Sequence, residues 1–138
     1  MDEAVVKYYR RMLRGSFEHT GALPNPSIFL NSIGENIRIC GQIASNYLHL
    51  YINVVDDRVQ EVKYLCTCDP TANVAIEILC VLIAGKTLDE ISALNAERFW
   101  QILGGPSRDL SQRADGLLEL VNRGVLRYQQ RKNDTFSA

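Results

Sequence analysis

The sequence predicts an α+β fold in which a three-stranded antiparallel sheet is covered by helices on one face. Apart from one N-terminal helix, strand-like segments come first and helical segments follow, an order typical of α+β domains. Residues 47–54 alternate between polar and aliphatic side chains, as in a sheet with one buried face. Residues 74–84 are apolar almost all round, which indicates a buried helix.

Length and composition favour one globular domain. The chain has 138 residues, 46% of them hydrophobic and 22% charged, so we expect a single domain at 1–132 and a disordered tail at 133–138. A net charge of -1 gives no reason to expect nucleic-acid or membrane binding. The first residues lack the apolar segment of a secretory signal, so we expect a cytoplasmic protein with reduced cysteines.

The N-terminal part predicts a helix followed by a long loop. Asp2 is a suitable N-cap, and Gly15 ends a run of apolar residues at helical spacing. Residues 15–35 are rich in glycine, proline, asparagine and serine. A loop of this length in a small domain is usually functional or mobile.

The strands are expected at 36–40, 47–54 and 59–66. Asp56 and Asp57 form the expected hairpin turn between the last two strands. A buried helix then begins at Pro70 and ends at Gly85, and shorter helices follow Thr87 and residue 95. The last helix begins at Ser107 or Ser111 and carries an apolar stripe.

Three cysteines fall at the ends of the expected strands. Cys66 and Cys68 point the same way if the backbone stays extended, and a neighbouring strand would bring Cys40 beside them. Thiolates are the ligands that zinc and iron–sulfur clusters select. Buried, inert cysteines are also common, so the residues alone leave metal binding open. Cys80 lies within the apolar helix and is expected to be a core residue.

Two other chemistries are excluded. The Gly-Lys-Thr step at 85–87 follows a helix rather than a strand and has no glycine at the required upstream position, so it is not a phosphate-binding loop. Neither His19 nor His49 belongs to a recognisable nucleophile–histidine–acid pattern in the sequence, so no catalytic triad is supported. We do not expect an enzyme, although sulfur transfer stays open.

Several short segments of the chain match one known protein family. The most specific is the hexapeptide Gly85-Lys86-Thr87-Leu88-Asp89-Glu90. The other matching segments are Tyr8-Tyr9, Gly15-Ser16-Phe17, Cys40-Gly41 and Val62-Lys63-Tyr64, the last leading to Cys68. Through these segments the chain resembles, over most of its length, the scaffold proteins of iron–sulfur cluster assembly, represented by IscU and the N-terminal domain of NifU.

The resemblance implies a ligand set of three cysteines and one acidic residue that holds a nascent cluster or zinc. Cys40 and Cys68 match the first two cysteines, whereas Gln42 replaces the aspartate. The third cysteine is missing at the expected position, around Leu110. The best substitute is Cys66, and the additional ligands considered are Asp69 and Asp109.

The resemblance leaves three functional hypotheses. The first is a scaffold-like protein that binds an iron–sulfur cluster, of the 2Fe–2S type, or iron, and accepts sulfur from a cysteine desulfurase for delivery to apo-protein recipients. The second is a zinc-bound sulfur acceptor. The third is a metal-free binding module for a desulfurase or another partner. A homodimer is compatible with all three.

Overall fold

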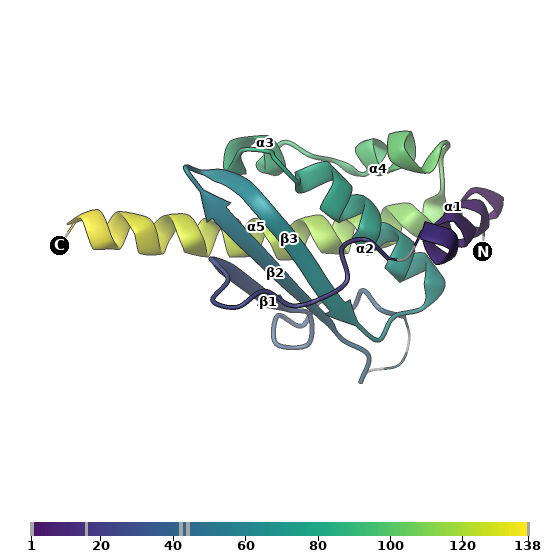
Figure 1. The fold of residues 1–138 in the computed structure, drawn as a ribbon, viewed down its shortest axis with the longest axis horizontal. Coiled ribbons are helices and arrows are strands. Elements are labelled where there is room, and N and C mark those ends of the chain that lie inside the picture. The colour runs from purple at the N-terminus through teal and green to yellow at the C-terminus, as the bar shows by residue number, and fades with distance from the viewer. Residues whose placement is uncertain (1, 16, 42, 44, 138) are drawn as a thin grey trace.

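The structure is a computed structural model that describes residues 2–15, 17–41, 43 and 45–137. Among these residues, the elements follow one another as one helix, three strands and four helices (Figure 1). Their bounds are α1 Glu3–Gly15, β1 Ile28–Asn31, β2 Leu48–Val55, β3 Arg58–Cys66, α2 Pro70–Ile83, α3 Leu88–Ser92, α4 Ala96–Leu103 and α5 Arg108–Ser137.

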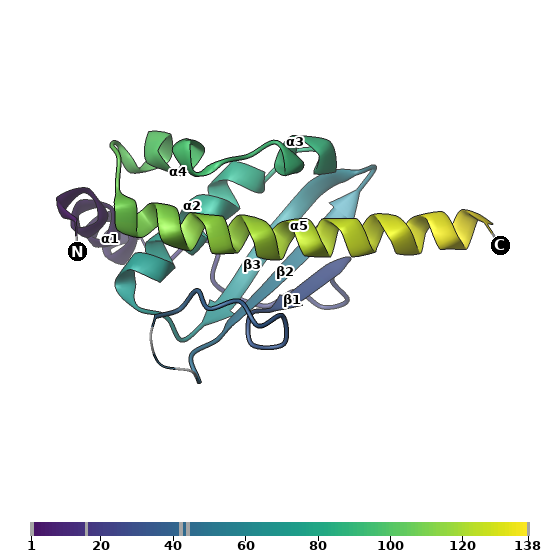
Figure 2. The ribbon, with the colours of Figure 1, turned by 180° about the vertical axis from the view of Figure 1, so that it is seen from behind.

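The sheet has the order β1-β2-β3, and both strand pairs are antiparallel. Helix α5 crosses one face of the sheet and extends beyond it at its C-terminal end, as Figure 2 shows from behind. Helix α2 packs against both α5 and β3. The predicted α+β fold, with three antiparallel strands covered by helices on one face, is therefore confirmed.

The central strand has the predicted alternation. Its aliphatic residues Leu48, Leu50 and Ile52 are buried, while His49, Tyr51 and Asn53 are partly exposed. The expected turn between β2 and β3 is also present, because Asp56 and Asp57 adopt φ values of 53° and 58°. Left-handed backbone at two successive residues is the conformation of a tight hairpin turn.

The first strand lies elsewhere than expected. Residues 36–40 form no strand, and β1 lies instead within the segment 15–35 that was expected to be a loop. Ile28 and Leu30 pair with β2 and are buried. Ile37 and Ile39 alternate for a different reason: their side chains approach α5 where Gly116 leaves room, 3.5 Å from the point where a Cβ would stand.

Residues 19–21 cover part of the free edge of β3. The backbone N–H of Gly21 donates to Tyr64 O at 2.8 Å, and the N–H of Tyr64 donates to His19 O at 3.0 Å. These bonds satisfy edge groups that would otherwise face solvent.

The helix boundaries follow their capping residues. The Asp69 carboxylate accepts a hydrogen bond from Ala72 N at 2.8 Å, so Asp69 caps α2 and Pro70 follows it. Thr87 and Glu90 form a capping box at α3. Helix α5 continues through Ser137, so residues 133–137 are helical where a disordered tail was expected; no proline or glycine interrupts them.

None of the helices in the described part of the chain is both long enough and apolar enough to cross a membrane.

Candidate functional site

Two of the predicted cysteines meet in the structure. Cys40 lies in the connection between β1 and β2, and Cys68 lies between β3 and α2. Their Sγ atoms are joined as a disulfide across 28 residues, with the Cα atoms 4.2 Å apart. Cys40 is only 3% exposed, whereas Cys68 is partly exposed. The fold therefore builds a two-cysteine site in which one sulfur is shielded and the other is reachable.

The backbone around each cysteine is fixed by a separate set of contacts. The Asn46 side chain donates to Cys40 O at 3.1 Å. On the other side, Thr67 N donates to Tyr47 O at 3.0 Å, and Cys68 Sγ lies 3.8 Å from the same carbonyl oxygen. Tyr47, directly before β2, therefore contacts the segment that contains Cys68, while the preceding residue Asn46 contacts Cys40.

Gly41 allows the two connections to approach each other. Its φ of +103° lies in a region that favours glycine. A Cβ at this position would stand 3.0 Å from Asp69 Oδ2. Gly41 is therefore required both for its backbone conformation and for its contact with the residue that follows Cys68.

Cys66 is not gathered with the other two cysteines. It is the last residue of β3, lies opposite Leu48 and has a free, partly buried thiol. Burial raises the pKa of this thiol to about 11; a hydrogen bond from the backbone of Cys68 lowers the pKa in part, and the charge of Glu77 raises it further. Burial therefore keeps Cys66 as the neutral thiol at neutral pH.

The two carboxylates proposed as additional ligands lie in different settings: Asp69 is bound by other groups of the protein, and Asp109 is exposed. Asp69 caps α2 through one oxygen and pairs with Arg113 through the other, at 2.8 Å. Asp109 is exposed in the first turn of α5. Leu110, at the expected position of the third cysteine, is fully buried in the core. Gln42, like Ser16, lies outside the residues that the structure describes.

These observations test whether the residues fit a bound metal. Within the described ranges, no group of three or more histidine, cysteine, aspartate or glutamate side chains is arranged to hold a metal ion. A structural zinc site is usually closed by four protein ligands. The chain brings two sulfurs together, and Asp69, which lies beside Gly41, is already ion-paired with Arg113, so these residues do not form a closed metal site.

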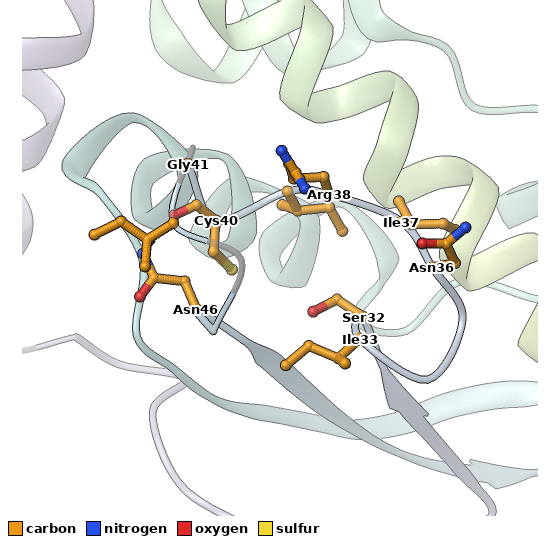
Figure 3. Close-up of a pocket in the computed structure, with 10 residues that line it drawn as sticks. Ser32, Ile33, Asn36, Ile37, Arg38, Cys40, Gly41 and Asn46 are labelled. Atoms are coloured by element: carbon orange, nitrogen blue, oxygen red, sulfur yellow. Dashed lines mark hydrogen bonds between the residues drawn. The ribbon is translucent and has the colours of Figure 1, made fainter.

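A shallow pocket of about 170 Å³ adjoins Cys40. Figure 3 shows Cys40, Gly41 and Asn46 at one end of this pocket, with Asn36 and Ile37 at the other. Two of its lining residues, Ile33 and Ile43, are 52% and 64% exposed. The pocket beside Cys40 therefore has a mixed lining, in which the polar Ser32, Asn36 and Asn46 lie among exposed isoleucines.

A buried polar cluster was missed by the sequence analysis. Glu77, which is 4% exposed, lies 2.8 Å from His19 Nδ1 and accepts a hydrogen bond from the Tyr64 hydroxyl at 2.9 Å. Burial, followed by the negative charge of Glu77, raises the pKa of Tyr64. The only indication in the sequence was Glu77 itself, a single glutamate inside an apolar helix. Its partners His19 and Tyr64 come from other segments of the chain. The cluster ties residues 17–21 to α2 and β3.

The order of elements and the sheet topology can be compared with those of known proteins. No protein-family model matches the chain, and no curated protein is detectably similar to it in sequence.

Two solved structures show the likeness in fold. One is a nitrogen-fixing NifU-like protein (N-terminal) from Brucella abortus, with a TM-score of 0.61, 14% identity and 94% coverage of each chain. The other is a putative iron–sulfur cluster assembly scaffold protein for the SUF system from Fervidobacterium islandicum. Its TM-score is 0.51 at 17% identity, with coverage of 94% of this chain and 86% of that chain. The expected IscU/NifU-like fold is confirmed.

Proposed function

We propose that this chain is a scaffold-like protein of iron–sulfur cluster assembly, and that its Cys40–Cys68 pair accepts sulfur from a cysteine desulfurase. One observation carries the proposal: the fold places these two cysteines, 28 residues apart, in direct contact. The likeness of the fold to a putative assembly scaffold and a NifU-like domain supports the choice of pathway.

In the reduced site, Cys68 is the sulfur acceptor because it is the more exposed of the pair. Its thiolate attacks the terminal sulfur of a persulfide on the desulfurase, which leaves a persulfide on Cys68 and a thiol on the donor. The pocket beside Cys40, which combines polar residues with the exposed Ile33 and Ile43, offers a docking surface to the donor.

Iron and a nascent cluster are cargo in this proposal. Thiolates suit both, and Cys40 and Cys68 together supply two of them. Because Leu110 is in the core and Asp69 is paired with Arg113, we expect the cargo to be held more weakly than in a site with four protein ligands. Recipient apo-proteins would then remove it readily.

The test is an anaerobic purification followed by incubation with iron, cysteine and a cysteine desulfurase. Bound iron, acid-labile sulfide and the visible spectrum are measured, and persulfide on each cysteine is mapped by mass spectrometry. Persulfide on Cys68, with iron and sulfide that are lost in Cys40→Ser and Cys68→Ser, supports the proposal. Cys80→Ala is the matched control, because Cys80 is fully buried in α2.

The same experiment distinguishes the other two hypotheses. Stoichiometric zinc without iron would favour the zinc-bound sulfur acceptor. A chain that takes up no sulfur and no metal would contradict the proposal and favour the metal-free binding module.

A further inference from the structure

The Cys40–Cys68 pair has the properties of a two-electron reductant. We propose that, once Cys68 has accepted sulfur as stated above, Cys40 reduces it to sulfide, so that the chain delivers sulfide rather than only carrying a persulfide. This inference rests on the proposed function and concerns the fate of the sulfur after its acceptance.

The step balances in atoms and electrons. The Cys40 thiolate attacks Cys68 Sγ in the Cys68 persulfide, a Cys40–Cys68 sulfur–sulfur bond forms, and the bond from Cys68 Sγ to the terminal sulfur breaks. The terminal sulfur leaves with the bonding electrons as hydrosulfide, and the proton released by Cys40 completes hydrogen sulfide. The transferred sulfur gains two electrons, and each cysteine sulfur gives up one.

The contacts support attack within the pair. The two sulfurs already form the bond that the step would produce, so a reduced pair needs little rearrangement to reach the product. The Cα separation of 4.2 Å is close to the range usual for bridged cysteines. The disulfide in the structure is then the spent form of the site.

The difference in exposure assigns the two roles. A donor can reach the partly exposed Cys68, whereas Cys40 is 3% exposed. Cys40 is therefore shielded from external thiols and persulfides, and Cys68 is the sulfur with which it is in contact. Because the acceptor Cys68 is reachable and the resolving thiol Cys40 is shielded, thiol exchange within the chain is favoured over exchange with thiols in solution.

The described residues around the pair suit this chemistry. Among the described residues, no third ligand joins the pair. Leu110 fills the core at the expected third position, and Arg113 holds Asp69 in an ion pair at 2.8 Å. Cys66 stands apart with a free thiol. A second turnover requires reduction of the disulfide by an external dithiol reductant.

The test uses the full chain, reduced with dithiothreitol and freed of it under anaerobic conditions. Glutathione persulfide is added stoichiometrically, with no other thiol present. Released sulfide is measured colorimetrically, and intact-mass and peptide-mass spectrometry distinguish a persulfide, a mixed disulfide with glutathione and the Cys40–Cys68 disulfide. The variants are Cys40→Ser and Cys68→Ser. Cys66→Ser is the matched control because Cys66 is a partly buried free thiol that is not part of the pair.

We expect wild type and Cys66→Ser to release one sulfide for each Cys40–Cys68 disulfide formed. Cys40→Ser should keep its persulfide on Cys68 and release no more sulfide than a blank without protein. If wild type keeps the persulfide and forms no disulfide, or if Cys40→Ser releases sulfide as fast as wild type, the inference is overturned while sulfur acceptance stands. If no chain acquires a persulfide or releases sulfide, sulfur acceptance itself fails. If a variant does not fold, the wild-type time course decides the matter: a Cys68 persulfide that precedes the disulfide supports the inference, and a mixed disulfide with glutathione that precedes it overturns the inference.

Discussion

Replacing Gly41 with alanine tests how the site is held together. Alanine at a φ of +103° costs roughly 1–3 kcal/mol of backbone strain. The new Cβ would also stand 3.0 Å from Asp69 Oδ2, the oxygen that pairs with Arg113, and weakening this partly exposed ion pair costs up to about 1 kcal/mol more. We therefore expect Gly41→Ala to lower the free energy of unfolding by about 1–4 kcal/mol.

The assay is urea denaturation of the reduced protein, followed by circular dichroism. The matched control is Gly34→Ala, because a Cβ at Gly34 meets only Asn31 O at an ordinary 3.6 Å and needs no left-handed φ. That variant should change the free energy of unfolding by less than about 1 kcal/mol. A second measurement is the rate at which the Cys40–Cys68 disulfide forms, which should fall only in Gly41→Ala. Equal denaturation midpoints for the two variants would refute the reasoning.

Three further predictions concern the buried groups near the site. The pKa of Cys66 is raised from 9.0 to about 11 in the folded chain, so the free energy of unfolding should fall as pH rises through this interval. The fall should be shallower in Cys66→Ser when both proteins are denatured with urea from pH 8.5 upward. Glu77→Gln should lower the pKa of Cys66, measured as the pH dependence of its alkylation, and an unchanged profile would show that the charge of Glu77 does not reach the thiol. Cys80→Ala should cost about 1 kcal/mol of stability and leave sulfide release unchanged, so a loss of sulfide release at unchanged stability would contradict its assignment to the core.

Much of the fold could be predicted because its patterns are local. The alternation in β2, the Asp56-Asp57 turn and the apolar run of α2 each specify their own element. The four-residue strand β1 could not be found this way, because its pattern is short and its pairing partners are residues 49–52, well separated from it in the chain. The Ile37/Ile39 alternation was misleading because these residues approach α5 near Gly116 instead of joining the sheet.

The candidate site was predictable only in part. The spacing of Cys66 and Cys68 would orient both side chains alike if the strand continued. Strand β3 ends at Cys66, however, and the chain turns so that Asp69 can cap α2. Cys68 therefore does not continue the strand. It pairs with Cys40, while Cys66 stays outside the disulfide. The sequence shows that Leu110 is not a cysteine, but only its burial shows that the position belongs to the core.

The contact between His19 and Glu77 has a consequence for the order of folding. It joins residues 58 positions apart in the chain, and closing a loop of this length costs roughly 3–4 kcal/mol of chain entropy by the logarithmic relation. The β2–β3 hairpin closes through a turn of two residues and forms at a far smaller entropic cost. We therefore expect the hairpin to form early, α2 to pack on it, and residues 17–21 to dock late. The same segment would be among the first to open in the native state, which would bare the edge of β3 before the sheet itself is lost.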